Sequence, residues 1–131
     1  MIVQASKAVS ASRGEQDQAD RQRVPIWFDT LEPRAAAKVA TAYAKIERGD
    51  VGKLEPVGAG VLEFKISYGP GYRVYLAYDG TKLVILLGGG DKTSQDGDIK
   101  DAKRLWAEYK RRKAGAARKA AEEARRQAKK R

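Results

Sequence analysis

The chain has 131 residues, a length typical of one domain, and its 27 Lys and Arg against 17 Asp and Glu give a net charge of +10. It contains no Cys and no His, which excludes disulfides, a thiol nucleophile, a Ser-His-Asp triad and any thiolate or imidazole metal site. No apolar run reaches the length of a membrane span and no secretory signal is recognisable, so we expect a cytoplasmic protein without membrane contact. Catalysis would have to use Lys, Arg, Tyr, carboxylates or backbone groups, and no cofactor is expected.

Residues 1–23 form a weakly patterned segment. They contain short apolar stretches but no consistent period, so we expect little structure there beyond a first strand. From residue 24 the pattern predicts a short helix to residue 31 and a second helix over 34–48, which together make an αα-hairpin. The apolar stripe of the second helix consists of Ala36, Val39, Ala40, Tyr43 and Ile46.

Strand character follows the helices. Residues 55–60 are predicted as a loop, and alternating side chains predict strands over 61–68 and 72–78. The continuous apolar run at 82–87 suits a strand covered on both faces, and the glycines at 88–90 are expected to end it.

A last helix is predicted after these strands, with Thr93 or Ser94 as its cap and Gly115 as a point where it breaks. The order of elements predicts an α+β fold, an antiparallel sheet with the helices packed on one face. We place this domain at residues 24–113.

The positive charge is concentrated at the C-terminus. Residues 110–131 hold eleven basic and two acidic residues, whereas residues 1–109 hold 16 basic and 15 acidic residues. We therefore separate residues 114–131 as a basic, Ala-rich helical tail. Such a tail either attracts RNA or another polyanion without sequence preference or is only a solvated helix, and the sequence leaves both interpretations open.

Glu63, Lys65, Arg73 and Tyr75 share one face of the first two predicted strands. The opposite face is apolar and needs cover by helices, so we expect the polar face to be open. Arg73 can bind a phosphate through its forked guanidinium, Lys65 can accept a proton only in its neutral form, and Tyr75 can stack on a base or donate a proton. Lys92, beyond the third strand, reaches toward the same end of the sheet. The pattern by itself favours the other interpretation, a solvent-facing amphipathic sheet with a Glu63–Lys65 or Glu63–Arg73 ion pair.

The glycine-rich stretch before the last helix resembles two known loops but fits neither. It lacks the upstream glycine of a Walker phosphate loop. Its acidic residues do not fit a calcium loop, because the internal glycine and the closing glutamate are out of place. What remains is a strand-to-helix turn whose backbone amides can bind an anion, and no metal site is expected.

Four segments in this order resemble a known family. They are "VPIWFDTL" at residues 24–31, the end of the Ala-rich helix at 46–49, "YGPGYRVY" at 68–75 and "LLGGGDKTSQD" at 86–96. Together they resemble the RelE/ParE superfamily of toxins, and more closely its HigB-like, phage Gp49-related branch, often labelled addiction module killer proteins. The resemblance spans residues 24–113 and implies a RelE-like fold.

The resemblance also implies a function, that of the toxin in a type II toxin–antitoxin pair. Many such toxins cut mRNA on the ribosome without a metal, by attack of a ribose hydroxyl on the adjacent phosphate. A cognate antitoxin, commonly a helix-turn-helix DNA-binding protein, neutralises them. A ParE-like gyrase poison, or a degenerate toxin that serves as a protein-binding module, are the alternatives that the sequence leaves open.

The resemblance assigns roles by position. Arg73 matches the strand arginine that stabilises phosphate charge, Lys92 lies near a basic residue that follows the last core strand, and Lys65 matches a basic strand position after a small shift in register. These three are the expected catalytic residues. The residues expected to bind the RNA substrate are Glu63, Tyr75 and Gln95.

Overall fold

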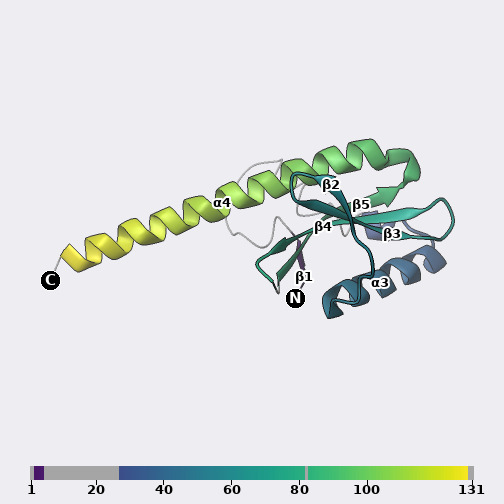
Figure 1. Ribbon diagram of the computed structural model, residues 1–131, viewed down its shortest axis with the longest axis horizontal. Helices are drawn as coiled ribbons and strands as arrows, with labels where there is room; N and C mark the ends of the chain where they lie inside the picture. Colours follow the sequence, from purple (N-terminus) through teal and green to yellow (C-terminus); the bar gives the residue numbers. More distant parts are fainter. Residues whose placement is uncertain (1, 5–26, 82, 130–131) are drawn as a thin grey trace.

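The computed structural model describes residues 2–4, 27–81 and 83–129, which form a five-stranded sheet between two helices (Figure 1). The strands are β1 (Ile2–Gln4), β2 (Glu55–Gly58), β3 (Val61–Ile66), β4 (Tyr72–Asp79) and β5 (Leu83–Asp91), in the spatial order β1-β5-β4-β3-β2. The long helices are α3 (Pro33–Arg48) and α4 (Gln95–Lys129), and the 3-10 turn η1 (Lys92–Ser94) joins β5 to α4. Residues 27–29 are also helical, as predicted for the short helix before α3. The predicted α+β class is confirmed.

The N-terminal strand β1 completes the sheet at one edge. It runs parallel to β5, with Val3 opposite Ile85, whereas all other neighbouring strands are antiparallel. The first strand predicted within residues 1–23 is therefore present, at Ile2–Gln4. The rest of that segment lies outside the described residues, as does the predicted start of the first helix at residues 24–26.

Helix α3 covers one face of the sheet. Glu32 caps it by accepting hydrogen bonds from the backbone amides of Arg34 and Ala35, and Gly49 ends it in the left-handed conformation at φ +79°. The helix is confirmed, but its stripe is rotated from the predicted one, since the buried residues are Ala35, Val39, Ala42 and Ile46. Ala40 is exposed. Because alanine fills so many positions, neighbouring stripes look alike in sequence, and contact with the sheet decides between them.

Helix α4 covers the opposite face, which the sequence led us to expect open. Tyr75, Ala77, Ile85 and Leu87 are buried there against Ala102, Leu105, Trp106 and Tyr109 of α4. The expectation of helices on one face was wrong. The apolar run of β5 sends alternate side chains to both faces, so Ile85 and Leu87 need cover as much as Val84 and Leu86 do.

Strand β5 continues through the three glycines instead of ending before them. Gly88, Gly89 and Gly90 pair with successive residues of β4, after an irregularity in the register of the two strands. A Cβ at Gly89 would lie 2.5 Å from the ring of Trp27, and one at Gly90 would lie 1.9 Å from a carboxylate oxygen of Asp98. The glycines therefore let an aromatic side chain and the start of α4 approach the backbone of β5 closely.

This close approach makes Gly89 sensitive to substitution. We expect Gly89→Ala to lower the free energy of unfolding by about 1 to 3 kcal/mol, because the added methyl group overlaps the Trp27 ring. Gly97→Ala is the matched control, since no atom lies within 4 Å of a Cβ at this helical position. The control should be neutral or stabilising by up to about 1 kcal/mol. Urea unfolding at equilibrium measures both, and equal midpoints for the two variants would contradict the packing.

The segment predicted as a loop before β3 contains an edge strand instead. β2 pairs with β3, with Pro56 opposite Leu62 and a register shift before Gly58. Proline lacks an amide hydrogen and glycine has no side chain to pack, so the segment reads as a loop from sequence. At the edge of a sheet both are tolerated, because one side of the strand needs no ladder hydrogen bonds.

Helix α4 passes Gly115 without the predicted break and projects well beyond the sheet (Figure 1). The cost of one glycine, about 1 kcal/mol, is small beside the helix propensity of the alanines around it. None of the helices in the described ranges has an apolar stretch of the length that a bilayer requires.

A polar contact fixes α4 where it leaves the sheet. Tyr109 Oη donates a 2.6 Å hydrogen bond to Asp79 at the end of β4, and Lys113 Nζ lies 2.6 Å from both oxygens of the same carboxylate. The bonds from Lys113 and then Tyr109 lower the pKa of Asp79 below its ordinary value. Burial and the neighbouring carboxylate raise the pKa of Tyr109 to about 12.

The lowered pKa of Asp79 predicts a pH-dependent contribution to stability. A carboxyl group with a lowered folded-state pKa stabilises fully above the unfolded value, about pH 4, and the stabilisation is lost as the pH falls through the folded value. Asp79→Asn should therefore be clearly less stable than the parent at pH 7, and the difference should shrink at about pH 3. Asp50→Asn, which removes an exposed partner of Arg48, is the control and should show no such trend. If the stability difference between the parent and Asp79→Asn were the same at all pH values, the lowered pKa of Asp79 would be contradicted.

Candidate active site

The four polar residues of the hairpin strands do share one sheet face. β3 and β4 pair so that Lys65 lies opposite Arg73 and Glu63 lies opposite Tyr75. On β5, Gly90 lies beside Arg73 and adds no side chain. Because α4 covers this face, Glu63 is only 2% exposed and Tyr75 is completely buried. The row of Lys65 and Arg73 lies at the margin of the covered area.

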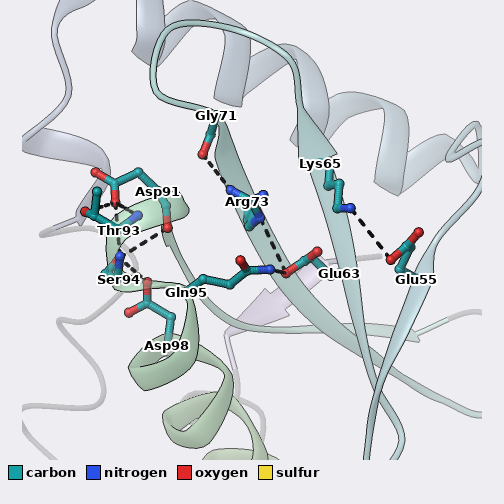
Figure 2. Close-up of polar contacts among 10 residues, drawn as sticks. All are labelled: Glu55, Glu63, Lys65, Gly71, Arg73, Asp91, Thr93, Ser94, Gln95 and Asp98. Carbon is teal, nitrogen blue, oxygen red and sulfur yellow. Dashed lines mark hydrogen bonds and ion pairs between the residues drawn. The ribbon is translucent and has the colours of Figure 1, made fainter.

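Arg73 is held in place from two sides (Figure 2). Its Nη1 donates a 3.0 Å hydrogen bond to the carbonyl oxygen of Gly71, and its Nε lies 3.7 Å from Oε2 of Glu63. The side chain is 11% exposed, and the buried Nε forms no hydrogen bond within the described part of the chain. The guanidinium is therefore a fixed cation at the surface margin.

Glu63 receives a second partner from α4. Gln95, the first residue of α4, donates a 2.9 Å hydrogen bond from Nε2 to the same Glu63 oxygen that faces Arg73 (Figure 2). Two groups from different elements thus converge on one buried carboxylate oxygen. This contact ties β3 to the start of α4, and it turns Gln95 toward the interior of the site.

Tyr75 lies beneath α4, not on an exposed surface. Its hydroxyl is buried and forms no hydrogen bond with any residue that the structure describes. Burial, and next the charge of Glu63, raise the pKa of Tyr75 far above its ordinary value. The hydroxyl therefore stays protonated at any physiological pH, and its ring is not placed where a base could stack on it.

Two exposed lysines flank Arg73. Lys65 on β3 has its Nζ 3.7 Å from Oε2 of Glu55 on the edge strand, and both side chains are 51% exposed. Lys92 begins η1 directly after β5 and is exposed, with no recorded partner among the described residues. Since β4 lies between β3 and β5, Lys65 is on one side of Arg73 in the order of the strands, and Lys92 follows the end of the strand on its other side.

The turn before α4 is closed by Asp91, a residue that we did not expect to act as a cap. Its Oδ1 accepts hydrogen bonds from the Thr93 hydroxyl at 2.6 Å and from the amides of Thr93 and Ser94 at 2.9 and 3.2 Å. These bonds, the Thr93 hydroxyl foremost, lower the pKa of Asp91. Asp before a helical turn is a common cap and would have been the signal. Since its carboxylate occupies both amides, the predicted anion-binding role of this turn is not supported.

The site combines cations at its surface with a single buried carboxylate below. Over the described residues, no group of three or more carboxylates is arranged to hold a metal ion. Arginine and lysine at these positions can bind a phosphodiester and stabilise added negative charge on it. The arrangement therefore suits the chemistry of a phosphate group.

Residues 26–113 match the family described as phage-derived protein Gp49-like, over more than half of the chain. An uncharacterized protein of Haemophilus influenzae is 45% identical over 80 residues, which cover 60% of this chain and 81% of that protein. No solved structure matches the chain. The resemblance found in the sequence is confirmed, and the family implies an antitoxin as partner. The chain thus belongs to the phage-derived Gp49-like family, a family of RelE/HigB-type toxins.

Proposed function

We propose that this toxin is a ribosome-dependent mRNA endonuclease whose active site comprises Arg73, Lys65 and Lys92. The observation that carries the proposal is the fixed guanidinium of Arg73 at the margin of the sheet, opposite the exposed Lys65 on β3 and next to the end of β5, where the exposed Lys92 begins η1. Guanidinium and ammonium groups are the side chains that proteins use most for phosphate. The absence of His and Cys from the sequence is compatible with this chemistry, because none of its steps needs them.

The reaction is the transfer of a phosphate to a ribose hydroxyl of the same RNA strand. The 2′-oxygen loses its proton to water and bonds to the adjacent phosphorus, and the bond from phosphorus to the 5′-oxygen breaks as that oxygen takes a proton. The product ends in a cyclic phosphate. Extra negative charge develops on the phosphate in the transition state, and Arg73 is placed to stabilise it. Lys65 and Lys92 position the phosphates of the strand on either side.

Glu63, Tyr75 and Gln95 take a supporting role in this proposal. From their positions in the sequence we expected them to bind RNA, but the first two are buried and the third points toward Glu63. They can act on the RNA only through the residues above them. The partners of the proposed enzyme are mRNA and the ribosome in the cytoplasm, and an antitoxin, for which a helix-turn-helix DNA-binding protein is our expectation.

Expression of the intact chain without its antitoxin tests the proposal. We expect growth arrest, together with new RNA 5′ ends inside translated codons when total RNA is sequenced. In translation extracts, an mRNA with a 2′-deoxyribose at the mapped cut site should resist cleavage altogether, because the nucleophile is missing. Growth arrest with intact mRNA and accumulating DNA breaks would reject the nuclease and favour the gyrase-poison alternative. Arrest with neither would favour a protein-binding module.

A further inference from the structure

Glu63 is the one charged side chain among the buried residues that the structure describes. An ionised carboxylate in such a place is stable only when it is paired and hydrogen-bonded. Its compensation comes from Arg73, 3.7 Å away, and from the 2.9 Å hydrogen bond of Gln95. All three side chains meet under the margin of the sheet, where the exposed cations of the site begin.

We propose that Glu63 is a positioning residue that holds the Arg73 guanidinium in its catalytic orientation, with Gln95 fixing Glu63 in turn. The inference deepens the proposed function and rests on it. Glu63 has no access to RNA, so it acts through Arg73 and not on the substrate. The Gly71 carbonyl accepts a hydrogen bond from Nη1 of the same guanidinium, so that a hydrogen bond holds one end of the group and the charge of Glu63 attracts its Nε.

Burial distinguishes the Arg73–Glu63 pair from other ion pairs with the same separation. Arg48–Asp50 and Lys65–Glu55 have the same 3.7 Å separation, but their side chains are 51% exposed or more. Water screens such pairs, and both partners can move freely. In the buried pair, removal of the carboxylate leaves an uncompensated cation in the protein. The guanidinium then turns outward to water, and its orientation toward the phosphate is lost.

Steady-state kinetics of Glu63→Gln test the inference on ribosomes programmed with an mRNA that contains the mapped cut site. We expect kcat to fall about tenfold or more, with KM changed by less than about twofold, since positioned charge acts in the transition state. Gln95→Ala keeps the charge pair and should give a smaller loss of kcat. Asp50→Asn, which also neutralises one partner of a 3.7 Å ion pair, is the matched control and should retain full activity.

A double-mutant cycle separates positioning from a merely structural role. If Glu63 acts through Arg73, the variant Glu63→Gln/Arg73→Ala should be no slower than Arg73→Ala alone. An additive loss would overturn the inference. The NMR signal of the Arg73 Nε–H group, assigned by its absence from Arg73→Ala, is a readout independent of activity. It should be sharp and dispersed in the parent and in Asp50→Asn, and averaged toward the free-arginine position in Glu63→Gln.

Failure of the nuclease function and failure of the positioning role give different results. If the parent cuts no RNA, the proposed nuclease function fails, and the NMR signal still decides whether Glu63 orients Arg73. If the parent cuts RNA but Glu63→Gln has the same kcat and the same Arg73 signal, the positioning role is wrong. If Glu63→Gln does not fold, Glu63→Asp and Gln95→Ala replace it, because both keep the carboxylate charge. The same two measurements, kcat and the Arg73 NMR signal, then apply to them.

Discussion

Arg73→Ala is expected to reduce mRNA cleavage by about 100-fold or more and to abolish growth arrest, because it removes a preorganised charge that faces the transition state. The side chain is only 11% exposed, so the substitution also removes the packing of its buried methylene groups. It leaves Glu63 without its cation as well. The thermal unfolding of the variant must therefore be measured beside its activity.

Two further substitutions make this result interpretable. Arg48→Ala removes an arginine of equal size from an exposed ion pair and should retain full toxicity. Arg73→Lys keeps the charge but loses the planar fork, and we expect it to recover only part of the activity. If folded Arg73→Ala were as toxic as the parent, Arg73 would have no catalytic role, and the phosphate site would have to be sought elsewhere on the protein.

Removal of residues 114–131 is expected to weaken RNA binding strongly and to make it much less dependent on salt. The deleted segment holds seven basic and two acidic residues. Its part of α4 projects beyond the sheet and is exposed along nearly its whole length (Figure 1). Most of its cations fall within about a third of the helix circumference and form a basic face, which also contains Glu122 and so has a net charge of +4: Arg118, Lys119, Arg125, Arg126 and Lys129.

The salt dependence measures how many phosphates the seven basic residues of the tail contact. About six contacts to single-stranded RNA would contribute a slope of about −4 in a plot of log K against log salt concentration. Fluorescence anisotropy with a labelled RNA between about 50 and 200 mM salt gives the slope with and without the tail. Replacing the five cations of the face with Gln keeps the helix and should reproduce most of the effect of the truncation, which also removes Lys130 and Arg131. An unchanged slope in both variants would make the tail only a solvated helix.

Local sequence patterns were sufficient to predict the family, the α+β class and most of the elements. The predictions were wrong where a residue type that usually ends a strand or helix lies within one. Residues 88–90 are glycines in a strand, residues 55–58 contain a proline at a sheet edge, and Gly115 lies within a helix. In each case the tertiary setting tolerates a residue that the local rule treats as a break, because close packing, an unpaired edge or a long helix offsets its cost.

The candidate site divides in the same way. Alternation along two strands was enough to place Lys65, Arg73, Glu63 and Tyr75 on one face, because side chains in a strand alternate with a fixed period of two. It could not show that α4 buries half of this face, although the apolar run of β5 contained the signal. The burial of Glu63 and its hydrogen bond to Gln95 join residues 32 positions apart. Only the tertiary structure decides such a contact, since it depends on where α4 begins and on which face it packs.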